Sequence, residues 1–232
     1  MLRISIDGAC RRNGQPDCIS AGGIFVQHFD EDGQVLQTVI QSNFEHKSTN
    51  QRGELLALLK ALDYIWEAQM DAHIVTDSEY LFKTMTKDWL YTWEKKGWIN
   101  ALNEPVKNID LLQEVLRMYN ACTEFGIEIV FYHIKGHVIP FGKVTARKLL
   151  ESDITGIALY EAIQKKLATI VDTFGIPALA LELSEKNNGQ LPESILKEFI
   201  VTNLIADAAA TKCVEAADSK RKMVLQPLSS KV

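Results

Sequence analysis

The sequence predicts an α/β fold built on a five-stranded mixed sheet with helices packed around it. Three strand-like segments come first, and beyond residue 50 helical segments alternate with further strands. Consecutive strands joined by short turns pair antiparallel, whereas strands reached through a helix are added parallel. We therefore expect a leading antiparallel meander followed by parallel additions.

The first three strands are predicted over residues 2–6, 21–29 and 35–44. The turn Asp30–Gly33 joins the second strand to the third, and its Asp-Gly pair is a strong hairpin signal. A helix is predicted from Asn50 to Ala68, because its leucines and isoleucine recur at helical spacing on one stripe.

Two more strands and two more helices are predicted before residue 135. Residues 73–76 form a short buried strand, and Ser78 can cap a helix that continues toward Lys87. An aromatic-rich segment follows, and Pro105 suits the first turn of a helix that reaches about Phe125. Residues 127–134 complete the sheet. Functional sites gather where the strands of such sheets end.

The last third of the chain is predicted to be helical. A helical stripe covers Ile157 to Phe174, a break follows at Gly175–Pro177, and Pro192 can start a long helix that ends near Ala217. The residues from Ser219 onward are polar and are expected to be disordered.

Composition places the chain among ordinary globular proteins, with 47% hydrophobic and 24% charged residues. A net charge of −5 argues against a protein that holds nucleic acid by bulk charge, although it leaves room for a local basic patch. No apolar run is long enough to span a bilayer, so we expect no membrane association and a cytoplasmic protein. The four cysteines lack CxxC spacing, so reduced thiols are expected rather than a zinc or redox centre.

Four carboxylates occupy positions where an unpartnered charge is costly. They are Asp7 in the first strand, Glu54 near a helix start, Asp77 at a strand end and Asp207 in the last helix. Taken singly, Asp7 can be a turn residue, Glu54 a favourable helix-start charge and Asp77 a cap. Together they favour a site for hard divalent cations, which take oxygen ligands and can promote phosphodiester hydrolysis.

Seven parts of the sequence, in order, resemble type 1 ribonuclease H, the enzyme that cuts RNA in RNA–DNA hybrids. They are Ile6–Cys10, Thr49–Leu55, Thr76–Ser78, Trp93–Trp98, Pro105–Leu111, Ile134–His137, and Asn203 with Asp207. The resemblance covers residues 1 to about 138 and resumes near Asn203. It implies the ribonuclease H-like fold and metal-dependent cleavage of the RNA strand, leaving 5′-phosphate and 3′-hydroxyl ends.

The resemblance also implies a role for each matching residue. The ligands of two Mg²⁺ ions, with Mn²⁺ as an alternative, would be Asp7, Glu54, Asp77 and Asp207. His137 would assist proton transfer or product release. The RNA–DNA hybrid would be contacted by Asn13, Thr49, Asn50, Gln51, Trp93, Lys95 and Lys96. Alternatively, Trp93 belongs to a small local core with its neighbouring tryptophans, and the two lysines form a solvated face.

The sequence departs from the family pattern in three ways. Glu79 stands where the family often has a neutral amide, and the basic protrusion carries fewer cations than the bacterial form. His137 and Asp207 are 70 positions apart, where the family has a short loop. Asp153 is therefore a rival to Asp207, which we favour because Asn203 and Asp207 share one helix face.

We expect a single domain over residues 1–218, a helical insertion over residues 139–200 and a disordered tail over residues 219–232. The insertion is either an added helical layer, which we favour, or a substrate or partner surface that uses Lys143, Arg147 and Lys148. The enzyme is expected to be a monomer, with an unidentified protein partner possible at the insertion. The alternative functions are a related two-metal DNA nuclease and a non-catalytic hybrid- or partner-binding module.

Overall fold

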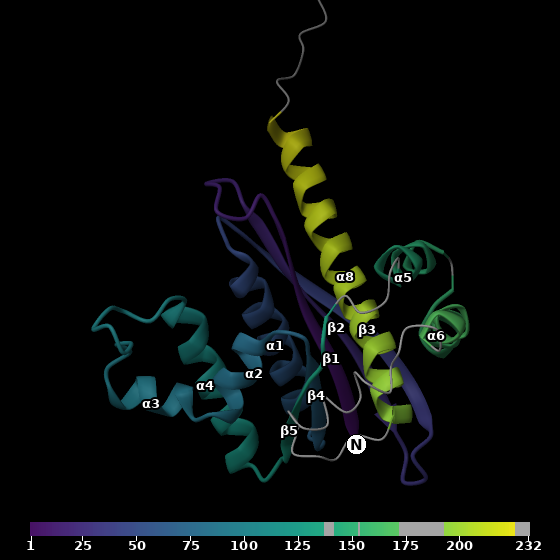
Figure 1. Ribbon diagram of the computed structural model, residues 1–232, viewed down its shortest axis with the longest axis horizontal. Helices are drawn as coiled ribbons and strands as arrows, with labels where there is room; N and C mark the ends of the chain where they lie inside the picture. Colours follow the sequence, from purple (N-terminus) through teal and green to yellow (C-terminus); the bar gives the residue numbers. More distant parts are fainter. Residues whose placement is uncertain (137–141, 153, 172–192, 226–232) are drawn as a thin grey trace, which may run out of the picture.

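The computed structural model describes residues 1–136, 142–152, 154–171 and 193–225. Its centre is a five-stranded mixed sheet with strand order β3-β2-β1-β4-β5 (Figure 1). The strands are β1 (Leu2–Arg11), β2 (Ile19–Phe29), β3 (Val35–His46), β4 (Ala72–Thr76) and β5 (Ile129–His133). β1, β2 and β3 pair antiparallel, whereas β4 and β5 add in parallel. The sheet predicted from the sequence is confirmed.

Helices cover both faces of this sheet. They are α1 (Asn50–Ala68), α2 (Glu79–Thr86), α3 (Trp89–Lys95), α4 (Ile109–Glu124), α5 (Gly142–Leu150), α6 (Gly156–Val171) and α8 (Glu193–Leu225). Successive side chains of a strand point to opposite faces. Ile24 and Val26 of β2 accordingly pack in one core cluster with α1, whereas Phe25 packs in the other with Phe199 of α8.

Two adjacent glycines on β2 allow α1 and α8 to approach the sheet backbone. A Cβ atom added to Gly22 would lie 2.6 Å from the Cα atom of Ala57 in α1. A Cβ atom added to Gly23 would lie 2.6 Å from the backbone nitrogen of Ala210 in α8. Ordinary van der Waals contacts begin near 3.4 Å, so any larger residue at these positions would push a helix outward.

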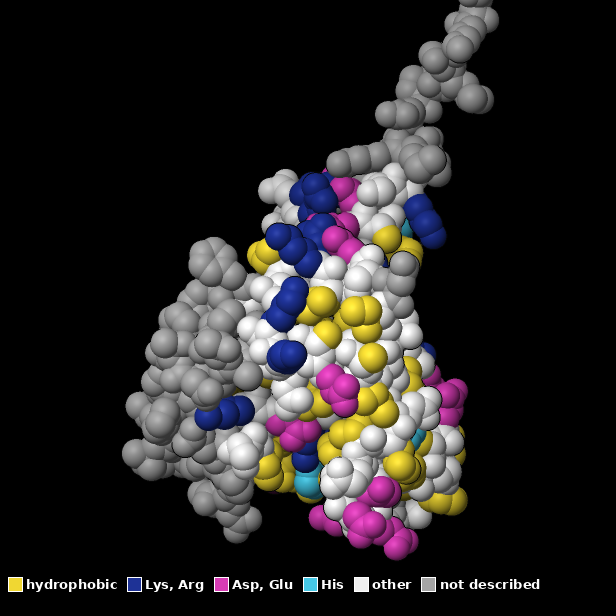
Figure 2. All heavy atoms as spheres, turned by 90° about the vertical axis from the view of Figure 1, so that its right-hand side faces the viewer, with side chains coloured by type: hydrophobic (Ala, Val, Ile, Leu, Met, Phe, Trp, Pro, Cys, Tyr) yellow, Lys and Arg dark blue, Asp and Glu magenta, His cyan; other side chains and the backbone are white. Residues whose placement is uncertain are grey.

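Helices α5 and α6, which lie within the predicted insertion, form a layer on the α8 side of the sheet (Figure 1). Ala146 and Leu149 of α5, and Tyr160 and Ile163 of α6, lie in the same core cluster as Phe199. Apolar burial is the main driving force for such packing, so α5 and α6 extend the core rather than stand apart from it. Figure 2 shows this side of the molecule, where hydrophobic and basic side chains are both exposed.

Two helix boundaries differ from the sequence-based expectation. α4 begins at Ile109, because Pro105 forms an isolated β-bridge with Ile99 and Asn108 has a left-handed backbone (φ 59°). α8 continues to Leu225, past the expected start of the tail at residue 219. Residues 226–232 and the predicted break at 175–177 lie outside the described residues.

No helix in the described parts of the chain is long and apolar enough to cross a membrane.

Candidate active site

Two of the predicted carboxylates are brought together by the pairing of β1 with β4. The two strands run parallel, with Ile6 opposite Thr76. Asp7 continues β1 and Asp77 directly follows β4, so the residues occupy equivalent places on neighbouring strands. Asp7 is 6% exposed, so it is largely shielded from solvent.

Glu54 reaches the same place from α1. A Cβ atom added to Gly8 would lie 2.5 Å from the backbone nitrogen of Glu54, so the missing side chain at Gly8 lets the helix settle against β1. The backbone N–H of Gly8 donates a hydrogen bond to the Glu54 carboxylate. The Asp-Gly pair therefore supplies one acidic group and the space for a second.

Asp207 is positioned by two polar contacts between α8 and β1. Ser5 Oγ donates to Thr202 Oγ1 at 2.6 Å, and Asn203 Nδ2 donates to the Ile6 carbonyl at 3.3 Å. Asp207 lies one helical turn beyond Asn203, on the same face of the helix. It is 4% exposed and lines the same cleft as the other three carboxylates.

Together the acidic residues form a compact cluster. Ligand oxygens of Asp7, Glu54 and Asp77 lie within 4.8 Å of one another, a spacing that could hold a metal ion. The three also line, with Asp207, a cleft of about 620 Å³. The rival residue Asp153 lies outside the described residues.

Burial and mutual repulsion of the clustered carboxylates favour a bound cation. The pKa of Glu54 is raised to about 8, chiefly by burial and then by the nearby carboxylates of Asp77 and Asp207. Glu54 Oε2 is buried and has no hydrogen-bond partner among the described residues. A divalent cation would offset both the burial and the mutual repulsion, so the side chains present fit a metal site.

His137 lies outside the described residues, but the chain that leads to it passes the cluster. A Cβ atom added to Gly136 would lie 2.9 Å from Asp77 Cγ. Gly136, the last described residue before His137, therefore lies beside the Asp77 carboxylate.

The predicted substrate contacts on the β1–β2 loop and at the start of α1 lie together at the cleft. Asn50 and Gln51 line the cleft, and the Asn50 N–H donates to Asn13 Oδ1 at 3.4 Å. Thr49 caps α1 by accepting a hydrogen bond from the Arg52 N–H at 3.4 Å. All four predicted substrate contacts of this group are exposed, namely Asn13, Thr49, Asn50 and Gln51.

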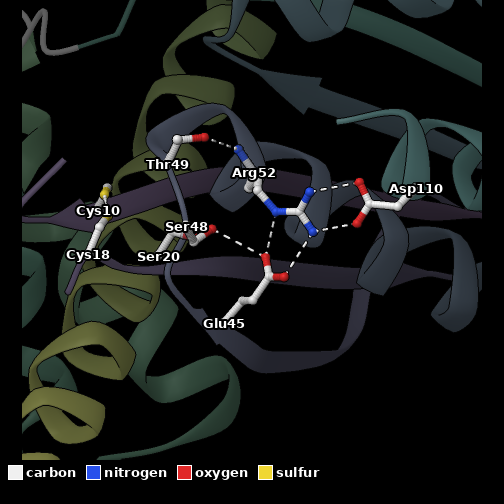
Figure 3. A network of polar contacts seen from close by, with 8 residues as sticks. All are labelled: Cys10, Cys18, Ser20, Glu45, Ser48, Thr49, Arg52 and Asp110. Atoms are coloured by element: carbon white, nitrogen blue, oxygen red, sulfur yellow. Dashed lines mark hydrogen bonds and ion pairs between the residues drawn. The ribbon is translucent and has the colours of Figure 1, made fainter. Parts of the chain in front are cut away.

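A charged network that the sequence did not reveal holds the start of α1 (Figure 3). Arg52 donates from Nε and Nη2 to Glu45 of β3, at 2.7 and 2.8 Å, and from Nη1 and Nη2 to Asp110 of α4, at 2.8 and 2.6 Å. Both pairs are bidentate, which fixes geometry as well as adding energy. They raise the pKa of Arg52 and lower that of Asp110.

A second unforeseen contact joins the β1–β2 loop to α8. Arg11 and Arg12 both pair with Asp218, at 3.3 and 2.6 Å, and Asp218 is 2% exposed. Sequence reasoning placed Asp218 at the end of the domain, next to a disordered tail. Its buried pairing needs the loop and the helix to meet in space, and local sequence carries no signal for that.

The protrusion residues lie apart from the cleft. Trp93, Lys95 and Lys96 do not belong to the residues that line it. Trp93 packs against the core and contacts the ring of Trp89 at a centroid distance of 5.7 Å, as the local-core alternative expects. The two lysines are exposed. Glu79 pairs with Lys83 on the surface of α2 at 2.8 Å.

A mixed five-stranded sheet with buried carboxylates at the ends of its central strands defines the class of ribonuclease H-like hydrolases. The RNase H family model matches residues 2–145. The chain is 35% identical over 155 residues to a ribonuclease H of Nitrosococcus oceani, covering 67% of this chain and 95% of that protein. It is 34% identical over 146 residues to a ribonuclease H of Rickettsia felis, covering 63% and 86%. The chain therefore belongs to the ribonuclease H family, and the predicted enzyme class is confirmed.

Solved structures agree on the fold. LC9-RNase H1, described as a type 1 RNase H with the type 2 active-site motif, matches with a TM-score of 0.50 at 23% identity. That match covers 59% of this chain and spans 63% of the other, which is less than two thirds of its length. Prototype foamy virus protease–reverse transcriptase matches with a TM-score of 0.52 at 18% identity, over 92% of this chain and 20% of the viral one.

Proposed function

We propose that this protein hydrolyses the RNA strand of RNA–DNA hybrids in a reaction that depends on divalent metal ions. The observation that carries the proposal is the cluster of Asp7, Glu54 and Asp77, with Asp207 in the same cleft, in a chain of the ribonuclease H family. Burying carboxylates costs free energy, so fold stability alone does not explain four buried or half-buried carboxylates in one cleft.

The carboxylates would hold two Mg²⁺ ions, or Mn²⁺, bound through Asp7, Glu54, Asp77 and Asp207. Such a pair supplies activation of the attacking water and stabilisation of the leaving 3′ oxygen. The raised pKa of Glu54 supports this assignment, because a site for two cations brings carboxylates so close that they repel one another when no cation is bound.

The other residues would place the substrate and move protons. Asn50 and Gln51 line the cleft, and Asn13 accepts a hydrogen bond from the Asn50 N–H. Their amide groups can donate to and accept from the sugar and base edges of a hybrid minor groove. Thr49 would hold a DNA phosphate, and Arg52 would position this whole group by anchoring the start of α1. His137 would accept or deliver a proton at the product end of the reaction.

Substrate recognition would extend to the protrusion. Lys95 and Lys96 are exposed cations at the end of α3, where phosphate contact would supply affinity without sequence preference. Trp93 would support them from beneath, since its ring is partly packed against the core.

A gel assay with the RNA strand end-labelled tests this proposal. The substrates are an RNA–DNA hybrid and the matched double-stranded RNA and double-stranded DNA, each with Mg²⁺, Mn²⁺ or EDTA. Internal cuts confined to the hybrid, and abolished by EDTA, are the expected result. Cleavage of the DNA duplex would point to a related DNA nuclease, and folded protein without activity on any substrate would point to a binding module.

A further inference from the structure

Two cysteines that the proposed chemistry does not use lie at the base of the β1–β2 loop. Cys10 lies near the end of β1, and Cys18 directly precedes β2. Their Sγ atoms are 2.6 Å apart (Figure 3). Nonbonded carbon atoms settle at roughly 3.5–4.0 Å and sulfur is a larger atom, whereas disulfide sulfurs are about 2.05 Å apart. The two sulfurs are therefore closer than separate thiols favour.

The strand register explains why these side chains meet. Cys10 pairs with Ser20 across the β1–β2 ladder. Side chains two residues apart on a strand share a face, so Cys18 is a diagonal neighbour of Cys10. The loop between them turns through left-handed backbone at Arg12 (φ 60°) and Gly14 (φ 76°). The approach of the two thiols is thus built into the hairpin.

The two cysteines also differ in access. Cys10 is half-buried and lines the catalytic cleft, whereas Cys18 is fully buried. A reagent in the cleft can reach Cys10, and Cys18 can then act only on Cys10. Cys122 in α4 and Cys213 in α8 lie elsewhere in the fold and serve as internal references.

We propose that Cys10 and Cys18 form a reversible disulfide that fixes the β1–β2 loop beside the cleft. The oxidant is the disulfide of a small thiol. The Cys10 thiolate attacks one sulfur of that reagent and releases one small thiol, and Cys18 then attacks the mixed disulfide and releases the second. The two cysteines lose two protons and two electrons, and the reagent becomes two thiols.

The bond would act on the loop that carries a proposed substrate contact. Asn13 Oδ1 accepts a hydrogen bond from the Asn50 N–H at 3.4 Å, and the Cys10 thiol lies 3.9 Å from the same oxygen. Closing the loop at its base removes conformations in which Asn13 leaves this position. A pre-organised contact lowers KM rather than raising kcat. This consequence rests on the proposed function, whereas the disulfide does not.

The rate of bond formation sets the conditions of the test. Burial, and then the shared contact with Cys18, raise the pKa of Cys10 to about 12. The thiolate is the nucleophile, so oxidation is slow at neutral pH and is best followed at mildly alkaline pH.

The experiment titrates the full-length protein with mixtures of oxidised and reduced glutathione. Intact mass and peptide mapping after alkylation should show one Cys10–Cys18 bond, with Cys122 and Cys213 alkylated. The midpoint of thermal unfolding should rise by roughly 5 °C on oxidation and return with reductant. Full alkylation of both cysteines at every ratio, or a mixed disulfide that persists on Cys10, would overturn the proposal.

Variants separate the bond from general effects of oxidation. Cys10→Ser and Cys18→Ala should each abolish the thermal shift, whereas Cys213→Ser should keep it. Cys10→Ser carries the test if the buried alanine variant fails to fold. A KM for hybrid that falls severalfold on oxidation of the parent is expected, and an unchanged KM would refute the link to substrate binding. Mass and thermal readouts need no catalysis, so an inactive enzyme leaves the disulfide test intact.

Discussion

Gly23→Ala tests whether the close contact between α8 and β2 positions Asp207 for catalysis. The added Cβ atom would lie 2.6 Å from the Ala210 backbone nitrogen and would also contact the Ala206 carbonyl, so it meets backbone on both sides of Asp207. The nitrogen must move to at least the 3.4 Å of an ordinary contact, which is a shift of about 0.8 Å. Backbone cannot turn aside as a flexible side chain can, so the helix itself has to move.

The magnitude follows from that displacement. Overpacking a well-filled site costs roughly 1–3 kcal/mol of the free energy of unfolding. Misplacing a catalytic group by about 1 Å costs roughly 10²-fold in rate. We expect Gly23→Ala to fold with a lowered unfolding midpoint and to cleave hybrid with kcat reduced roughly 10²-fold.

The assay measures kcat and KM for hybrid cleavage in Mg²⁺, below the unfolding transition. Gly33→Ala is the matched control, because Gly33 has φ 77° in the β2–β3 turn and no atom within 4 Å of an added Cβ. It should lose stability through backbone strain while keeping kcat. A Gly23→Ala enzyme with the parent's kcat would refute the idea that this contact positions Asp207.

Three further predictions concern charge. In metal-free protein the raised pKa of Glu54 means that the folded state binds more protons than the unfolded state between pH 4.5 and about 8, so stability falls as pH rises through that window. Glu54→Gln removes this loss of stability. In urea unfolding with EDTA, the free energy of unfolding of the variant relative to the parent should increase with pH across this window, by up to about 1.4 kcal/mol per unit of the pKa shift. A difference that does not depend on pH would contradict the assignment. Lys95→Ala and Lys96→Ala should each weaken hybrid binding and reduce the salt slope of log K by roughly 0.9, measured by fluorescence anisotropy, and an unchanged slope would place them off the substrate. Asp218→Asn should weaken the contacts of Arg11 and Arg12 with α8 and loosen the β1–β2 loop, raising KM for hybrid with little change in kcat; a parental KM would show that the loop holds its place without these pairs.

The sheet was predictable because its signals are local. The Asp30–Gly33 turn between two strand-like segments predicts the hairpin, and the structure places β3 at Val35 as expected. The helix after residue 105 was predicted to begin too early, because proline is only statistically preferred at helix starts. Here Pro105 pairs in a β-bridge, and left-handed Asn108 ends the loop instead.

The clustering of the acidic residues was predictable, and the residues that support them were less so. Asp7, Glu54 and Asp77 each follow a local signal that the resemblance ties together, and the structure brings their ligand atoms within 4.8 Å. Arg52 and Asp218 gave no such signal. Their partners lie up to 206 positions away in the sequence, and only the packed helices and strands bring them close.

The end of α8 was hard to predict from the sequence. Helical periodicity indicated a last helix, but the apolar stripe does not extend into the polar residues after Ala217 and so could not predict that they are helical. Asp218 is buried against Arg12 of the β1–β2 loop, which gives the helix a tertiary contact beyond Ala217. Tertiary contacts commonly decide where a helix ends when propensity is neutral.

Single-turnover cleavage of an RNA–DNA hybrid by Asp77→Asn protein tests the central claim most directly. Asparagine keeps the size of the side chain and removes the charge from a residue that faces Glu54 in the cluster. We expect folded protein that binds hybrid and cleaves it at least about 10³-fold more slowly than the parent in Mg²⁺. Cleavage at the parent's rate, at equal enzyme concentration, would contradict a catalytic role for the carboxylate cluster.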